Sequence, residues 1–509
     1  MQLKKFIEKY GIYLLILIAV TAVFFYYGHA KAGYYIDEVY TYGLSNSHNA
    51  PYLKDVAGGD LIDKIITRDD LISYVTVDEG EELDFSSVYT NQEADVHPPL
   101  YYWLFNLVSG IAGEKFSKWT GLLLDYIIYL GVLALLAVIC NEMFDNRFTT
   151  YSALILYGVS IAGISTAVYI RMYCLLTFLT LALVHFSVLL MRKKKLKYCI
   201  FVGLTIFAGM MTQYYFVFYA FFICCALLVY FIAKKEYVIM WKFAACAVAG
   251  VALMVLLFPA SIKHVFVGNG QVVSGGVAVD NFFNFVAWPE RIIKYAHFVT
   301  HGLKAAVIVG AIAFIYLLLT RRLEFSPEIA VIVIPAVVTW LLIALMSAVK
   351  EERYIYNIMP VFIIFVAWLL NHMHIHYAAL VCIAALALNN TGCNVDYIQP
   401  TALDKNEILA PYSGSPCVYL TDNKFAAMTS DYYELLNFEN FFSTDNTQSK
   451  DMLKYIGDAD KVVVYIDSND EWSSGFNPEE KIKEMQVSTG FNKSEKVIDN
   501  SLSVVYVLS

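Results

Sequence analysis

The chain has 509 residues, of which 59% are apolar and 16% are charged, and its mean hydropathy is +0.56. This composition excludes an ordinary soluble globular protein and indicates a polytopic α-helical membrane protein. The net charge is −9, and the segment 31–95 alone holds fourteen Asp and Glu against four Lys and Arg. Such an acidic balance argues against nucleic acid as a partner.

The apolar segments predict about eleven transmembrane helices. The first segment follows Lys4 and Lys5 and ends in bulky aromatic residues, which favours a membrane anchor over a cleaved signal peptide. Each segment is long enough, or nearly long enough, to cross a bilayer. The segments are 10–27, 118–141, 148–168, 172–191, 198–212, 214–232, 241–259, 303–320, 328–348, 355–372 and 376–390.

The basic clusters between these segments predict the orientation of the chain. With a cytoplasmic amino terminus, all of them fall on the cytoplasmic side, as the positive-inside rule requires. An odd number of spans then places the carboxyl terminus outside, together with the loops 28–117 and 261–302. The clusters are Lys4 and Lys5, Lys193 to Lys195, Lys234 and Lys235, and Arg321 and Arg322.

The outer loop 28–117 carries two motifs. YYIDEVYT places Asp37 and Glu38 shortly after the first span, and DVHPPLYYW places His97 before two prolines. Pro99 suits the first turn of a helix, and the aromatic residues that follow are typical of headgroup depth. We therefore expect a short helix after Pro99 that lies along the outer membrane interface.

Two arginines interrupt apolar sequence at the predicted outer ends of spans. Arg171 is followed by Tyr173, and Arg353 is followed by Tyr354. A guanidinium near a membrane interface needs an anion, and phosphate matches its geometry best. We expect these groups and the loop carboxylates to gather at one face of the membrane.

The tail 391–509 predicts a separate α/β domain outside the membrane. Alternation of strands and helices favours a small layer with a mainly parallel sheet. Cys393 and Cys417 are the cysteines expected in water, and a disulfide between them is only weakly supported. The predicted strands are 416–422, 438–445 and 461–468, and the predicted helices are 431–436, 449–457 and 478–485.

In order, spacing and sidedness, these motifs resemble the GT-C superfamily of membrane glycosyltransferases. The chain looks most like the branch of bacterial aminoarabinose transferase and the protein O-mannosyltransferases, through the DE pair, HPPLYY, Arg171 with Tyr173, and RYIYNIMP at 353–360. His97 matches the mannosyltransferase pattern, where aminoarabinose transferase has lysine. Gln213, in TQYY, stands where many relatives have a histidine-tyrosine pair.

The resemblance implies that residues 1–390 form a GT-C-like catalytic domain that takes a sugar from a polyprenyl-phosphate-linked donor. Such a reaction needs a base for the acceptor hydroxyl and a cationic pocket for the departing phosphate. Asp37 is the candidate base; Glu38 would support its hydrogen bonds, help ligate a divalent cation, or face water. The candidate donor-binding residues are His97, Arg171, Tyr173, Gln213, Arg353 and Tyr354.

A role for metal is left open. The run DEGEELD, 78–84, lacks the spacing of a calcium loop and is typical of a solvated face. His372, His374 and His376 alternate, but they fall in a predicted cytoplasmic turn, far from the candidate site. No residue is assigned as a metal ligand, and a divalent cation is an open question.

Three other classes of function compete with a transferase. A transporter or flippase of a lipid-linked saccharide would show repeats, broken helices and ionisable groups at the bilayer midplane, where this sequence offers little beyond Asp125 and His185. A polysaccharide polymerase or ligase would keep its key arginines in a late loop, and a receptor would leave the loop carboxylates dispensable. A glycosyltransferase of a bacterial plasma membrane is favoured. The sequence does not specify its sugar, or whether the acceptor is a glycan, lipid or protein.

Overall fold

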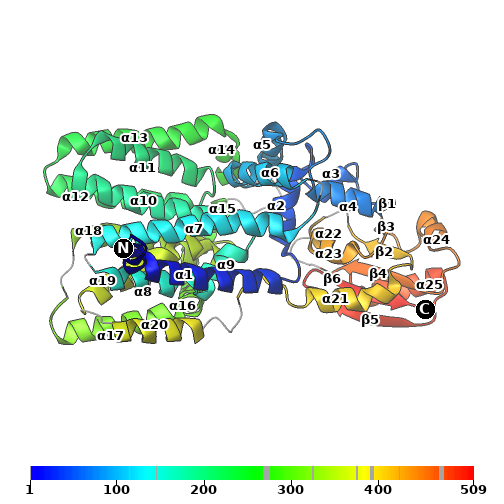
Figure 1. Cartoon of the computed structure of the whole chain (residues 1–509). Coiled ribbons are helices and arrows are strands. Elements are labelled where there is room, and N and C mark those ends of the chain that lie inside the picture. Colours follow the sequence, from blue (N-terminus) through cyan, green and yellow to red (C-terminus); the bar gives the residue numbers. More distant parts are fainter. Residues whose placement is uncertain are drawn as a thin grey trace. The chain divides into compact units, whose positions relative to one another are not determined.

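The computed structural model (Figure 1) describes residues 2–113, 115–144, 146–266, 275–323, 326–373, 377–389, 395–422, 425–468 and 475–509. The chain divides into two compact units. The helical unit comprises Met1–His29, Val96–Tyr101 and Leu122–Asp396, and the sheet unit comprises Ala30–Asp95, Tyr102–Gly121 and Tyr397–Ser509. Most of the first loop shares a unit with the tail, whereas Val96–Tyr101 of that loop belong to the helical unit.

Long apolar helices make up the helical unit. A helix satisfies its own backbone polar groups, which is what a bilayer requires of a spanning segment. Among the described residues, seven helices are long and apolar enough to span a membrane. They are Tyr10–Ala30 of α1 (Gln2–Ala30), α7 (Lys118–Met143), α10 (Tyr173–Lys193), α12 (Phe216–Ala233), α13 (Tyr237–Leu257), α18 (Pro327–Met346), and Glu352–Asn371, which joins η1 (Glu352–Ile358) to α19 (Met359–Asn371).

Two further pairs of helices pass the same test of length and hydropathy only when each pair is taken together, and both pairs are bent. α8 (Arg147–Gly158) and α9 (Ile161–Val168) meet at 57°, and α16 (Trp288–Gly302) and α17 (Lys304–Leu319) meet at 97°. Ser160 explains the first bend, because its side chain accepts the Gly163 N–H at 2.9 Å and starts a new helix. Both α8–α9 and α16–α17 are thus interrupted rather than continuous.

The predicted polytopic helical fold is confirmed, but the predicted count of eleven spans is not. The described residues hold up to nine spans when each bent pair counts as one. The predicted segments 198–212 and 376–390 correspond to the shorter apolar helices α11 (Leu196–Met210) and α20 (Tyr377–Asn389). With 15 and 13 residues, these helices are shorter than the roughly 20 residues that usually cross a bilayer.

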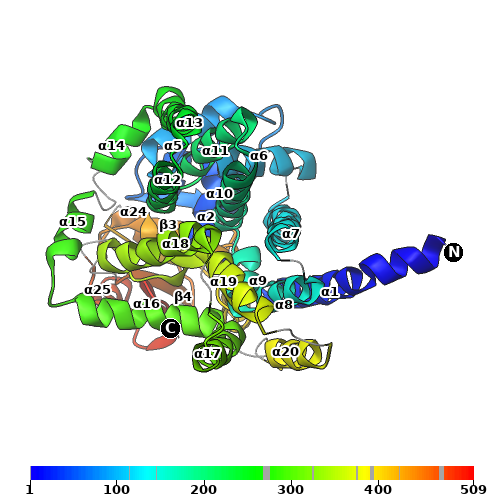
Figure 2. The ribbon, with the colours of Figure 1, turned by 90° about the vertical axis from the view of Figure 1, so that its left-hand side faces the viewer.

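The most buried candidate spans carry the residues of interest. Within α10, 83% of the span is buried, and within Glu352–Asn371 the share is 78%, whereas Tyr10–Ala30 and α13 each reach 28%. Figure 2 shows α18 and α19 between α10 and α12 on one side and α16 and α17 on the other. Residues at the starts of α10 and η1 are therefore held by the centre of the unit. The connection from α13 to α16 contains α14 (Ala260–Phe266) and α15 (Gly275–Phe283).

The sheet unit contains six strands in the order β1-β3-β2-β4-β6-β5. Only β3, β2 and β4 pair in parallel; β1, β6 and β5 join the sheet antiparallel. The prediction of a mainly parallel sheet is therefore wrong, because a carboxyl-terminal hairpin and a strand from the first loop complete a mixed sheet. The strands are β1 (Lys64–Thr67), β2 (Cys417–Leu420), β3 (Asn440–Thr444), β4 (Val462–Asp467), β5 (Ser494–Asp499) and β6 (Ser503–Leu508).

The predicted strands and helices of the tail are all present. β4 is buried along its whole length, as expected for a continuous apolar run at the centre of a sheet. Cys417 is a buried free thiol in β2, and Cys393 lies outside the described residues. The helices of the tail are α21 (Ala402–Leu409), η2 (Ala410–Tyr412), α22 (Ala426–Ser430), α23 (Tyr432–Leu435), α24 (Lys450–Ile456) and α25 (Pro478–Thr489).

Short helices form most of the first loop. The helix predicted after Pro99 is present as α6 (Leu100–Ala112). α4 begins at a capping box in which the Thr67 side chain accepts the Asp70 N–H and the Asp70 carboxylate accepts the Thr67 N–H. The other helices of this loop are α2 (Ile36–Asn46), α3 (Leu53–Val56), α4 (Arg68–Val75) and α5 (Phe85–Ala94).

Candidate functional site

Asp37 and Glu38 share the first turn of α2 but differ in their surroundings. Glu38 is fully buried, whereas Asp37 is partly exposed. The Glu38 carboxylate accepts hydrogen bonds from Lys31 Nζ at 2.8 and 2.9 Å and from the Tyr35 backbone N–H at 2.8 Å. Through the last of these, Glu38 closes a capping box that starts α2. Glu38 therefore does not face water, which was one of the roles that the sequence left open.

The Lys31–Glu38 ion pair holds the start of α2. Neither side chain has exposed surface, and Lys31 Nζ also donates to the Tyr397 carbonyl. A buried charge is costly unless it is paired and hydrogen-bonded, so each residue depends on the other. Asp37 stands beside this pair at a helix amino terminus, where the macrodipole favours a carboxylate. Of the two acids, Asp37 is the one that a substrate can reach.

Arg353 lies at the start of the central span Glu352–Asn371 and is 9% exposed. Its Nη1 donates to Tyr169 Oη at 3.0 Å, and its guanidinium carbon lies 6.0 Å from the Tyr169 ring centroid and 5.5 Å from that of Tyr354. The Tyr169 ring stacks on Tyr173 with centroids 5.7 Å apart. Cation–π contacts hold a guanidinium without neutralising it. The Arg353 guanidinium therefore lies beside two tyrosine rings, those of Tyr169 and Tyr354.

Arg171 lies in the short turn between α9 and α10 and is 3% exposed. Its backbone N–H donates to the Tyr169 carbonyl at 2.7 Å, which ties the two residues into one turn. Its Nη2 lies 3.5 Å from Nδ1 of His97, which comes from the HPPLYY motif. The structure thus brings His97 to Arg171, and places Arg171 two residues from the tyrosine that Arg353 contacts.

The loop 211–215 joins this group through Tyr354. The Tyr215 ring packs edge-on against Tyr354 with centroids 5.1 Å apart, and the Met211 carbonyl accepts the Leu100 N–H at 3.0 Å. Gln213, in the same loop, is buried, and its Oε1 accepts the Tyr215 N–H at 3.3 Å. Within the described residues, the Gln213 side chain makes this one hydrogen bond, which is local. We call Tyr169, Arg171, Tyr173, Arg353 and Tyr354 the arginine–tyrosine cluster.

Tyr169 is a member of this cluster that the sequence analysis missed. It stacks on Tyr173 and accepts a hydrogen bond from Arg353, which lies 184 positions further along the chain. The repeated tyrosines around Arg171, in YIRMY, were a usable signal.

Asp396 is a second residue that sequence reasoning missed. Its carboxylate accepts hydrogen bonds from Tyr356 Oη at 3.1 Å and from Ser165 Oγ at 3.2 Å. The Tyr356 ring lies edge-on to Tyr173, with centroids 6.5 Å apart, so Asp396 is linked to the cluster through Tyr356. Burial, and then the nearby Glu352 charge, raise the pKa of Asp396 to about 6. No local pattern in the sequence marks this residue.

Other candidate polar residues have structural partners. Asp125 accepts hydrogen bonds from Tyr101 Oη at 3.0 and 3.2 Å, and His185 Nδ1 lies 3.1 Å from Glu142. Asp125 is thus a hydrogen-bonded polar residue between helices, and His185 lies beside an acid of α7. Among the described residues, no three His, Cys, Asp or Glu side chains come together in a metal-binding group. His374 and His376 lie outside the described residues.

Comparisons with known proteins identify the fold. A family model described as dolichyl-phosphate-mannose-protein mannosyltransferase matches residues 96–262. Two crystal structures of ArnT from Cupriavidus metallidurans match over 98% of this chain and 98% of theirs. The one bound to undecaprenyl phosphate is 10% identical with a TM-score of 0.53, and the apo structure is 11% identical with a TM-score of 0.54. The search of curated proteins finds no match. The chain therefore has the ArnT-like GT-C fold, and the predicted resemblance is confirmed.

Proposed function

We propose that this chain is an integral-membrane glycosyltransferase that moves a sugar, hexose or pentose, from a polyprenyl-phosphate-linked donor to an acceptor. The observation that carries the proposal is the arginine–tyrosine cluster, which holds two buried guanidinium groups at the starts of the two most buried spans. Guanidinium groups match phosphate geometry and remain charged at any working pH. The shared fold with ArnT, which has been crystallised with undecaprenyl phosphate, supports this choice of donor.

Arg171 and Arg353, with His97, would hold the departing lipid phosphate. As the bond from the anomeric carbon to the phosphate breaks, negative charge collects on the phosphate oxygens, and fixed cations stabilise that charge. Tyr173, Tyr354 and Gln213 would shape the pocket. The Tyr354 ring contacts Arg353, Tyr173 stacks on Tyr169, and the Gln213 loop packs on Tyr354 through Tyr215.

Asp37 would act as the general base that takes the proton from the acceptor hydroxyl. Its partly exposed carboxylate, at the start of a helix fixed by a buried ion pair, suits that task. Glu38 would position Asp37 rather than react, since its carboxylate is already engaged by Lys31 and by the Tyr35 N–H. A divalent cation has no assigned ligand in this scheme.

The proposed orientation follows from the basic clusters. The amino terminus would lie in the cytoplasm of a bacterial cell, and the loop 28–117 and the tail 391–509 would lie on the outer face of the plasma membrane. The acceptor would then be a glycan, lipid or protein reached from outside. The tail would form an extracytoplasmic domain that shapes acceptor access.

Flipping of a lipid-linked saccharide is a second candidate, favoured by the two interrupted spans. Broken helices are typical of transporters, where they frame a site at the bilayer midplane. A transporter would place ionisable groups at the bilayer midplane, whereas the two buried arginines, Arg171 and Arg353, lie at helix starts. We rank transfer above flipping for this reason.

The test is a transfer assay with purified protein, a radiolabelled polyprenyl-phosphate sugar and an acceptor extract. Asp37→Asn should lower the rate by about 10² or more, the usual cost of removing a general base. Asp69→Asn is the matched control, because Asp69 is an exposed acid in the first turn of α4. Full transfer by folded Asp37→Asn would remove Asp37 as base. Donor movement across vesicles without transfer by the wild type would favour the flippase.

A further inference from the structure

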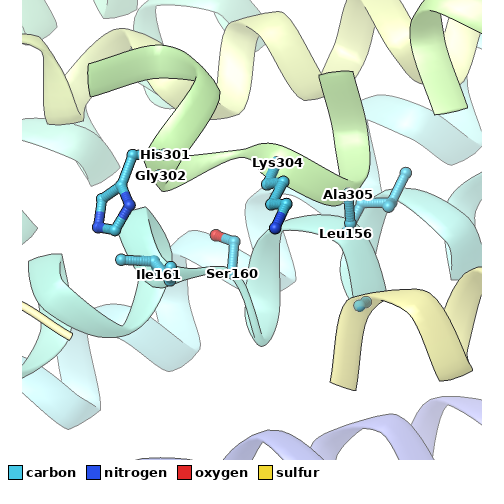
Figure 3. Close-up of a pocket in the computed structure, with 8 residues that line it drawn as sticks. Leu156, Ser160, Ile161, His301, Gly302, Lys304 and Ala305 are labelled. Atoms are coloured by element: carbon cyan, nitrogen blue, oxygen red, sulfur yellow. The ribbon is translucent and has the colours of Figure 1, made fainter. Parts of the chain in front are cut away.

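The elbow between α16 and α17 packs against the break between α8 and α9. These two interruptions line one small pocket together with Ala387 of α20 (Figure 3). The approach is close, because a Cβ built on Gly302 would lie 2.9 Å from the Ala162 Cβ. The space that a water-sized sphere can occupy in the pocket is about 10 Å³, roughly that of one water molecule.

The polar side chains of this pocket are one cation, Lys304, one imidazole, His301, and one hydroxyl, Ser160. Figure 3 shows Ser160 between the His301 ring and the Lys304 ammonium. The Ser160 hydroxyl is already used within its own turn, since it donates to the Tyr157 carbonyl at 2.8 Å and accepts the Gly163 N–H at 2.9 Å. His301 and Lys304 are therefore the groups that can meet a ligand, and both favour an anion.

Lys304 stands at the head of an exposed apolar stripe. Lys304 is the first residue of α17, and no side chain caps this end of the helix. The positive end of the helix dipole repels a cation at this position unless an anion lies nearby. At helical spacing below Lys304, the same face exposes large aliphatic side chains. These are Ile308, Ile312, Ile315 and Leu319, with 39, 60, 55 and 78% of their surface exposed.

The helix before the elbow has the character of an interfacial helix. α16 turns 97° away from α17 and opens with Trp288, and its buried residues Arg291, Tyr295 and Gly302 contrast with an exposed opposite face. If α17 crosses the bilayer, α16 lies along the surface, and the elbow falls at headgroup depth. A cation at headgroup depth above an aliphatic stripe matches the two chemical halves of a phospholipid.

We propose that this elbow binds an anionic phospholipid, with its phosphate at the pocket mouth against Lys304 and His301 and an acyl chain along the α17 stripe. The enclosed pocket is too small for a headgroup, so the phosphate occupies the mouth, where Lys304 is exposed. This site is separate from the arginine–tyrosine cluster and does not depend on the proposed transferase activity.

The experiment measures lipid retention by the purified full chain in detergent, by native mass spectrometry. Wild-type protein is titrated with phosphatidylglycerol and with phosphatidylcholine. One cation near an anionic headgroup is worth about fivefold in affinity, so Lys304→Gln should weaken phosphatidylglycerol binding about fivefold and leave phosphatidylcholine unchanged. Lys294→Gln is the matched control, because Lys294 is an exposed cation of α16 that lies outside the pocket and over the Phe298 ring.

Each outcome decides the proposal. Preferential retention of phosphatidylglycerol that Lys304→Gln reduces and Lys294→Gln leaves unchanged would support it. Equal retention of the two lipids by the wild type, or an equal loss with Lys294→Gln, would overturn it in favour of general surface adsorption. Displacement of phosphatidylglycerol by an equal concentration of inorganic phosphate would also overturn it, since the pocket would then bind a free anion. No arm requires transfer activity, so failure here leaves the transferase proposal intact.

Discussion

Replacing Glu38 by glutamine should strongly destabilise the sheet unit. The substitution keeps the size of the side chain but removes the charge that receives two hydrogen bonds from Lys31, at 2.8 and 2.9 Å. Lys31 would then lose this counter-charge, and breaking a buried ion pair in this way costs about 3–5 kcal/mol. For a unit of this size, about 2–4 °C per kcal/mol translates this into a fall in the melting temperature of roughly 6–20 °C.

A double-mutant cycle separates the ion pair from other effects. Lys31→Met and Glu38→Gln are made singly and together, and thermal unfolding of the purified protein is followed by intrinsic fluorescence. The double variant should recover much of the loss, because it no longer buries an unpaired charge, and the coupling between the sites should exceed about 1 kcal/mol. Lys496→Met serves as a control, since its pair with Asp499 is exposed.

The same variants test whether Glu38 positions Asp37. Glu38→Gln should also lower transfer at temperatures where the protein is still folded, because the Tyr35 N–H loses a charged acceptor and the start of α2 loosens. If Glu38→Gln has the melting temperature of the wild type, the pair is not a structural support and the reasoning fails. If stability falls but the rate in the folded protein is unchanged, Glu38 supports the fold without positioning the base.

Three further predictions follow from the described contacts. Arg353→Lys should raise the KM for the donor about tenfold or more, because an ammonium cannot reproduce the planar guanidinium beside two tyrosine rings. The KM is measured by varying the donor concentration in the transfer assay. An unchanged KM would contradict the proposed role of Arg353 in phosphate binding. Since the pKa of Asp396 is raised to about 6, the folded state binds that proton more tightly than the unfolded chain, so the free energy of unfolding should fall as pH rises from about 4 to 6. Asp396→Asn should flatten this part of the plot of melting temperature against pH. An identical plot for the variant would refute the prediction. Gly43→Ala should cost about 1–3 kcal/mol in thermal unfolding, because the new Cβ would lie 2.0 Å from the buried Tyr74 ring; a neutral result would mean that the ring has room to move.

Much of the secondary structure follows from local sequence. The helical spans were visible as apolar runs, and the strands β2, β3 and β4 as short apolar runs flanked by polar turns. β1 was missed because four residues, KIIT, are too short to show a period, and its partner β3 lies far along the chain. Strand direction was also misjudged, because the hairpin of β5 and β6 depends on pairings that no local pattern records.

The candidate site was only partly visible for a similar reason. Motif order drew attention to His97 and Arg171, and the structure records their contact at 3.5 Å. Glu38 looked equivalent to Asp37 in sequence, and only the position of Lys31 in space separates a buried ion-paired carboxylate from a partly exposed one. Asp396 was invisible, since its importance comes from side chains brought to it by other helices.

The edge strand β1 has a consequence for the order of assembly. Ile66 pairs with Phe441, so a segment made early in translation must wait for one made almost at the end before the sheet closes. During that interval β1 has an open edge, which is a template for mispairing with other chains. Expression of residues 1–390 without the tail should therefore yield an aggregation-prone protein, and supplying the tail as a separate chain should rescue it by strand complementation.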